Sequence, residues 1–168
     1  TFAKYTTPHA AQIICEWAII TLLPFYFIST LKLSPSVYGL VLCGLIIFFG
    51  IGSLASKRLI RLHGHEFTVF FSILASLVGG VGLLITYLYD SHQIYGLSFF
   101  IALFLFSQGL SFTPSVSNAL KPFQGLRATA SSVRGTLNAA ASLVGAYAAT
   151  IMPDNTLIPL SVFMIGLC

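Results

Sequence analysis

Six long apolar stretches, separated by short polar segments, constrain this chain more than any other feature of its sequence. The polar segments alternate between low and high positive charge: one lysine lies within 30–35, three cations and two histidines lie within 57–65, and one aspartate lies within 89–93. A water-soluble protein has no reason to sort its charges in this way. A chain that crosses a bilayer repeatedly does, because lysine and arginine in short loops stay on the cytoplasmic side.

The composition agrees with a membrane protein. Of 168 residues, 57% are hydrophobic and only 7% are charged, whereas about 25% of residues in an ordinary soluble domain are charged. The net charge of +4 comes from eight scattered cations, which are too few for a nucleic-acid surface and are typical of topology signals. The three cysteines have no paired spacing, so we expect neither a disulfide nor a metal site, and no cofactor.

The length of the apolar stretches predicts helices, because a spanning helix needs about 20 mainly apolar residues. Ser34 and Pro35 form a good helix start, a capping hydroxyl followed by proline at the first helical position. We therefore predict an all-α integral membrane protein whose residues 1–168 form a single six-helix transmembrane bundle. The predicted helices are 9–30, 35–59, 67–89, 94–112, 126–151 and a truncated 156–168, with cytoplasmic loops at 60–66 and 114–125.

The distribution of cations predicts that the N-terminus is cytoplasmic. Lys32 is then the single cation outside the cell. The cations on the cytoplasmic side are Lys4, Lys57, Arg58, Arg61, Lys121 and Arg127.

Glu16 is the acidic residue that no topology rule explains. It lies within the first apolar stretch, roughly 10–15 Å from the cytoplasmic end of the predicted helix. A charge at that depth costs at least about 2.5–3.5 kcal/mol, so the side chain is expected to face a partner or a water-filled cavity. Its carboxylate is a candidate for binding a proton or a cation, and a structural hydrogen-bonding role is the alternative.

Arg134 is the corresponding cation, and it is the natural partner of Glu16. It lies about 12 Å into the fifth predicted helix, which begins on the same side of the membrane. Arg134 belongs to a polar stripe with Arg127, Ser131 and Asn138, and such a stripe in lipid must face protein or water. A substrate-binding or gating arginine and a structural clamp are equally good interpretations.

Other polar and aromatic side chains are candidates for lining a cavity. Gln12 lies one turn before Glu16, and Gln108 is a lone amide within the fourth predicted helix, although satisfied interhelical hydrogen bonds would also explain them. Trp17 offers aromatic surface to a hydrophobic solute. The chain contains no motif that nominates a nucleophile with its base, so an enzyme is not expected.

Several segments resemble, in order, the second half of a major facilitator superfamily transporter. They are P-F-Y-F-I-S-T-L-K-L-S-P-S-V-Y-G-L (24–40), G-S-L-A-S-K-R-L-I-R-L-H-G (52–64), S-Q-G-L-S-F-T-P-S-V-S-N-A-L-K-P-F (107–123) and R-A-T-A-S-S-V-R-G-T-L-N (127–138). The closest similarity is to the Bcr/CflA-type drug:proton antiporters.

The loop motif of that superfamily is degenerate in this chain. The matching run begins at Gly52 and includes Arg58. Its leucine and second glycine match Leu59 and Gly64, but the motif's first glycine is replaced by Lys57 and its aspartate by Arg61. Because the aspartate is lost, this segment lacks the residue that usually supports a gating role in the superfamily.

The resemblance implies one half of a 12-helix transporter in a bacterial inner membrane, with an N-terminal half as its partner. It implies proton-coupled export of small amphiphilic molecules by alternating access. Glu16 would exchange the proton while the solute binds among Trp17, Tyr26 and the stripe of the fifth helix. The alternatives are a facilitator for an organic anion held by Arg134 and, in a different class, a membrane scaffold or receptor that transports nothing.

Overall fold

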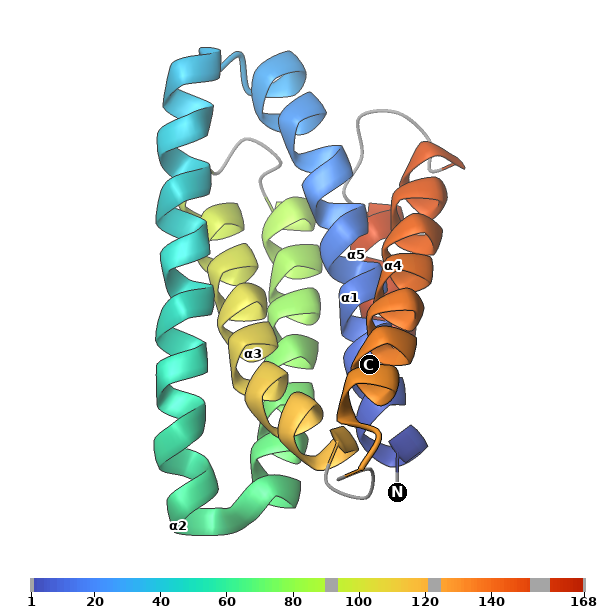
Figure 1. The fold of residues 1–168 in the computed structure, drawn as a ribbon. Helices are drawn as coiled ribbons and strands as arrows, with labels where there is room; N and C mark the ends of the chain where they lie inside the picture. Colours follow the sequence, from blue (N-terminus) through green and yellow to red (C-terminus); the bar gives the residue numbers. More distant parts are fainter. Residues whose placement is uncertain (1, 90–93, 121–124, 152–157, 168) are drawn as a thin grey trace.

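The computed structural model describes residues 2–89, 94–120, 125–151 and 158–167, and these residues are helical almost throughout (Figure 1). The prediction of an all-α protein is confirmed, since the described residues contain no strand. Their helices are α1 (Phe2–Phe25), the π-helix η1 (Tyr26–Thr30), α2 (Pro35–Tyr89), α3 (Ile94–Leu120), α4 (Arg127–Ile151) and α5 (Ile158–Leu167).

The prediction of a six-transmembrane-helix bundle, and with it half of a 12-helix fold, is wrong. The described residues contain five α-helices, and three helical stretches among them are long and apolar enough to cross a membrane: Thr7–Thr30, Pro35–Tyr89 and Ile94–Ser117. The remaining two, α4 and α5, are not among these candidates, and α5 has only 10 residues. Three such helices are compatible with a membrane protein.

Two predicted loops are largely helical. The first, 60–66, lies inside α2, and of the second, 114–125, residues 114–120 extend α3 through Pro114. Residues 121–124 lie outside the described residues. The side chains of Lys4, Lys121 and Arg127, on which the predicted orientation depends, are also outside them.

The chain reverses direction between α1 and α2 through a short, locally ordered connection. After Pro24, α1 widens into η1, and the backbone amide of Leu31 donates to the carbonyl of Tyr26 at 3.1 Å. The next helix begins as predicted: the hydroxyl of Ser34 accepts from the amide of Val37 at 3.4 Å, and Pro35 is the first helical residue.

α2 consists of two arms that meet at Gly64. This residue has φ 85° and ψ 176°, a conformation that is essentially restricted to glycine. The first arm descends at the left of Figure 1 and the second ascends beside α3. The turn therefore depends on one backbone position, while the charged residues around it stay helical and point outward: Lys57, Arg58, Arg61 and His63 are exposed.

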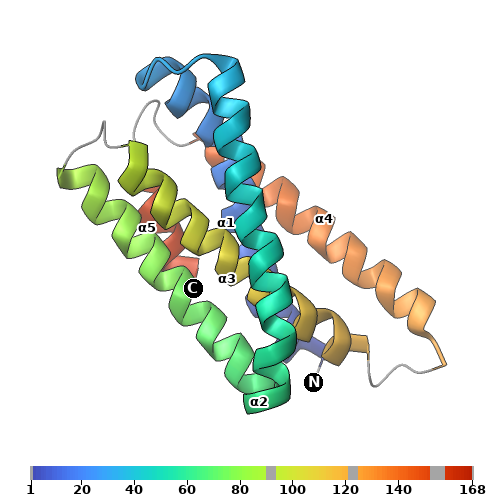
Figure 2. The same ribbon diagram turned by 90° about the vertical axis from the view of Figure 1, so that its left-hand side faces the viewer.

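Glycines allow both arms of α2 to pack closely on α3 (Figure 2). A Cβ at Gly52 would lie 2.2 Å from the carbonyl oxygen of Phe106, and a Cβ at Gly109 would lie 2.2 Å from that of Phe49. In the second arm a Cβ at Gly82 would overlap the Phe100 ring. The close approach of these helices thus depends on glycine at 52, 82 and 109, where a Cβ would overlap atoms of α3 or α2.

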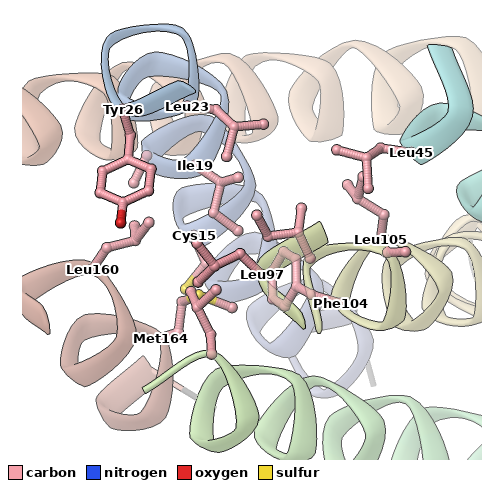
Figure 3. Close-up of a cluster of buried hydrophobic side chains, with 14 of the residues drawn as sticks. Cys15, Ile19, Leu23, Tyr26, Leu45, Leu97, Phe104, Leu105, Leu160 and Met164 are labelled. Atoms are coloured by element: carbon pink, nitrogen blue, oxygen red, sulfur yellow. The ribbon is translucent and has the colours of Figure 1, made fainter. Parts of the chain in front are cut away.

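An apolar cluster fills the space between α1, α2, α3 and α5. Figure 3 shows side chains of this cluster converging, among them Ile19, Leu97, Phe104 and Met164, each at most 2% exposed. Burial of each large apolar side chain contributes roughly 1.5–3 kcal/mol in water. This cluster fixes α1 against α3, and the polar site lies on the same two helices, nearer the start of α1.

α4 lies alongside α1 and runs in the same direction (Figure 1). The two helices touch at Gly145, where a Cβ would lie 2.1 Å from the carbonyl oxygen of Ile14. Its other faces are open: Leu143, Tyr147 and Ile151 are each at least 66% exposed. At Gly135, by contrast, no atom of the described residues lies within 4 Å of a Cβ position.

Candidate functional site

A polar stripe on α1 faces a polar stripe on α3. His9, Gln12 and Glu16 follow each other at spacings of three and four, which places them on one side of the helix. Gln108 and Ser111, three residues apart on α3, lie opposite them. Of these five, all but Glu16 are at most 3% exposed, so the stripes meet inside the protein.

Hydrogen bonds connect the two stripes into one network. The Ser111 hydroxyl donates to Gln12 Oε1 at 2.5 Å and lies 3.1 Å from the backbone carbonyl of Gln108. Nδ1 of His9 lies 3.4 Å from the same hydroxyl oxygen. At the other end the Gln108 amide donates to Glu16 Oε2 at 3.3 Å. Any change in the charge of Glu16 therefore acts directly on a side chain of α3.

A pocket of about 280 Å³ opens beside this network. Side chains of four helices surround it, so that a bound molecule would contact α1, α2, α3 and α4 together. Its walls combine aromatic and polar side chains. The lining residues are His9, Ile13, Glu16, Trp17, Phe49, Gln108, Phe112, Asn138 and Ser142.

Arg134 lies next to this pocket, on the turn of α4 before Asn138. Its side chain is 8% exposed, and its Cζ lies 6.0 Å from the centre of the Phe112 ring. The ring of His9 also lies 6.0 Å from Phe112, edge to face. The guanidinium is therefore near the His9 end of the site.

The expected pairing of Glu16 with Arg134 is not formed in the part of the chain that the structure describes. Glu16 accepts from Gln108 instead, and Nε and Nη2 of Arg134 have no hydrogen-bond partner among the described residues. The expected level of Glu16 assumed a helix that begins at residue 9. Because α1 begins at Phe2, Glu16 lies further along the helix from its start than expected. His9, seven residues or about 10 Å before Glu16 along the helix, occupies the level of the arginine.

Several buried polar atoms of the site lack a partner among the described residues. On the acceptor side they are Gln108 Oε1 and Asn138 Oδ1, and on the donor side they are Gln12 Nε2 and the two Arg134 nitrogens. An unpaired buried polar group costs roughly 1–3 kcal/mol, and more when it is charged. Such groups collected around one pocket indicate a site built to bind a polar molecule.

The structure separates the remaining predicted cavity residues. Trp17 lines the pocket and is 43% exposed. Tyr26 is 3% exposed in the apolar cluster, 6.2 Å from the Tyr87 ring, and does not line the pocket. Ser131 is exposed on α4 and is not a lining residue.

The residues of the loop motif lie apart from this site. Gly52 packs on α3, Gly64 makes the turn of α2, and the three cations are exposed. Leu59 is partly buried. Their arrangement supports the reversal of α2 and brings none of them to the pocket.

The sequence reasoning missed His9, Phe49, Phe112 and Ser142. A usable signal existed for His9, because its spacing to Gln12 and Glu16 continues a single helical face. It was missed because the predicted helix began at His9. No comparable signal existed for Phe49, Phe112 and Ser142, because aromatic and hydroxyl residues are too common in an apolar chain to be singled out.

The described residues contain no group of three histidine, cysteine or acidic side chains that would hold a metal ion. No protein-family model, curated protein or solved structure matches the chain. The resemblance to the major facilitator superfamily is therefore carried by the sequence segments alone, and the site has to be interpreted from its own geometry.

Proposed function

We propose that this chain belongs to a secondary transporter, of the major facilitator superfamily by the resemblance described above, that exports small amphiphilic molecules in exchange for protons. One observation carries the proposal: a carboxylate and a hydrogen-bonded polar network line a pocket on helices that are long and apolar enough to span a membrane. Ionisable groups in such helices are expensive and mark pathways for ions and substrates.

Glu16 is the proposed proton carrier. It lines the pocket and is held by a single described hydrogen bond, from Gln108. When a proton binds the carboxylate, this amide loses a charged acceptor and keeps only a neutral one, which weakens the contact between α1 and α3. Loading with proton and loading with solute thus act on the same pair of helices, as alternating access requires.

The orientation and location follow from the same proposal. The cations predict a cytoplasmic N-terminus, and the resemblance suggests a bacterial inner membrane. The pocket then opens among the halves of α1, α3 and α4 that lie nearer the cytoplasm.

The test is transport by the purified protein in proteoliposomes with an imposed pH gradient. A panel of radiolabelled amines, acids and zwitterions small enough for the pocket supplies the solutes. We expect at least one to be exchanged for protons, and Glu16→Gln to abolish the dependence on the gradient. Glu66→Gln is the matched control, since Glu66 is an exposed carboxylate at the turn of α2. Gradient-driven export that persists in Glu16→Gln would disprove the assignment.

A second candidate function is facilitated transport of an organic anion. It is favoured by Arg134, a buried cation with two unpaired N–H groups beside the pocket. In that case transport of carboxylates would depend on Arg134 and would not respond to the pH gradient. The same proteoliposomes distinguish the two functions, because only the first requires Glu16.

A further inference from the structure

The pocket has two chemically different ends. Glu16, Gln108 and Asn138 present oxygen atoms, and the amide oxygens of the last two are buried without a partner among the described residues. His9 lies at the other end. Arg134 is not a lining residue, but its guanidinium carbon lies 6.0 Å from the ring of Phe112, which lines the pocket and is also 6.0 Å from the His9 ring, and two of its N–H groups are unpaired among the described residues. A ligand that satisfies both ends must carry donors at one extremity and acceptors at the other.

The nature of the oxygen-rich end selects the donor. A carboxylate with two amide oxygens is matched by an ammonium group that has several N–H bonds, because each N–H satisfies one acceptor. A quaternary ammonium has no N–H and would leave both amide oxygens unpaired. The cost of unpaired buried acceptors therefore excludes it from tight binding.

The nature of the other end selects a carboxylate. The planar guanidinium of Arg134 presents Nε and Nη2 on one edge, and this pair of donors matches the two oxygens of a carboxylate. Arg134 is 8% exposed, and a buried cation without a partner is strongly unfavourable. An incoming carboxylate would supply the missing partner.

The distance between the ends and the walls between them define the rest of the molecule. His9 and Glu16 are seven residues apart on α1, which is about 10 Å along the axis. The remaining lining side chains are mainly apolar or aromatic, among them Ile13, Phe49 and Phe112. A volume of about 280 Å³ lies just below the range of about 300–1,000 Å³ that holds drug-sized ligands.

From these observations we propose that the pocket binds a small zwitterion, with a primary ammonium at Glu16, Gln108 and Asn138, a carboxylate at Arg134, and an apolar spacer between them. The proposal rests on the proposed transport function and names its substrate class. It is narrower than both candidate functions above, since neither a simple amine nor a simple acid would satisfy the two ends.

The test compares three probes of nearly equal size by isothermal titration calorimetry of the purified protein in detergent micelles. 4-(Aminomethyl)benzoate carries both charges, benzylamine lacks the carboxylate, and 4-methylbenzoate lacks the amine. We expect the zwitterion to bind at least about tenfold more tightly than either, the effect of one charge-assisted hydrogen bond or more. Equal affinity of either single-headed probe would overturn the proposal.

Two variants assign the ends. Arg134→Gln should lower the affinity for the zwitterion to the affinity for benzylamine, and it should leave the affinity for benzylamine unchanged. Glu16→Gln should lower the affinity for the zwitterion to the affinity for 4-methylbenzoate, and it should leave the affinity for 4-methylbenzoate unchanged. Ser131→Ala, on the same helix but exposed outside the pocket, is the matched control and should change nothing. If Arg134→Gln fails to fold, Arg134→Lys keeps the charge, and it should bind the zwitterion more weakly because it lacks the planar pair of donors.

Trp17 reports the location of binding, because it is the single tryptophan of this chain and lines the pocket. The zwitterion should change its fluorescence with the same affinity that calorimetry gives, and heat without any fluorescence change would overturn the assignment to this pocket. The titrations involve no proton gradient. Binding without transport would therefore disprove the proposed function alone, and transport without a preference for zwitterions would disprove this inference alone.

Discussion

The contact between α4 and α1 depends on the absence of a side chain at Gly145, and replacing this residue by alanine tests the arrangement of the site. The added Cβ would lie 2.1 Å from the Ile14 carbonyl oxygen, 2.9 Å from its carbon and 3.0 Å from its Cα. All three are backbone atoms, so no rotation of a side chain relieves the overlap. Ordinary contacts begin at 3.4 Å, and α4 must therefore withdraw by about 1.3 Å, the difference between 2.1 and 3.4 Å.

The energetic cost follows from two opposing terms. Overpacking of this kind costs about 1–3 kcal/mol, whereas alanine in place of glycine favours a helix by about 1 kcal/mol. Gly135→Ala is the matched control, because it lies in the same helix with nothing within 4 Å of its Cβ position. The propensity term cancels between the two variants, so Gly145→Ala should be less stable than Gly135→Ala by about 1–3 kcal/mol.

The measurement is thermal unfolding of both variants in the same detergent. For a chain of this size the difference corresponds to a Tm that is lower by about 2–12 °C in Gly145→Ala. Because α4 supplies Asn138 and Ser142 to the pocket, ligand affinity should fall as well. Equal Tm values for the two variants would refute the packing of α4 on α1.

Three further variants test the rest of the fold by the same unfolding measurement. Gly64→Ala should cost about 1–3 kcal/mol because its backbone conformation is strained for any residue with a Cβ, whereas Gly39→Ala, in open space, should cost nothing. Phe104→Ala should cost about 3–5 kcal/mol from the core, and Leu40→Ala, which is 74% exposed, much less; similar losses would contradict the assigned core. Ser56→Ala should cost about 1 kcal/mol, since its buried hydroxyl donates to an α3 carbonyl at 2.8 Å, and an unchanged stability would argue against that bond.

The sequence predicted the parts of the fold that depend on local chemistry. Ser34 and Pro35 mark a helix start because one supplies a cap and the other lacks an amide hydrogen. The helical class follows from apolar stretches that are too long for strands.

Tertiary geometry explains what the sequence did not predict. The polar segment 57–65 led to the prediction of a loop at 60–66, but long cationic side chains reach solvent from a helix as well as from a loop, and the reversal needs only Gly64. Pro114 suggested a helix end, yet α3 continues through it. For the site, Glu16, Gln108 and Asn138 were predicted as cavity residues and line the pocket. The level of Arg134 relative to Glu16 was not predictable, because it depends on how α1 and α4 are displaced along each other.

The reversal of α2 at a single glycine has a consequence for the tolerance of this chain to insertions. In an ordinary loop, an extra residue is absorbed at little cost. After Gly64, one inserted residue would rotate the whole second arm by about 100° about its axis, and its buried face, which carries Thr68, Ser72 and Ser76, would turn outward. Insertions of seven residues would nearly restore the original facing, since they complete almost two turns. The permitted lengths at this turn should therefore follow the period of the helix.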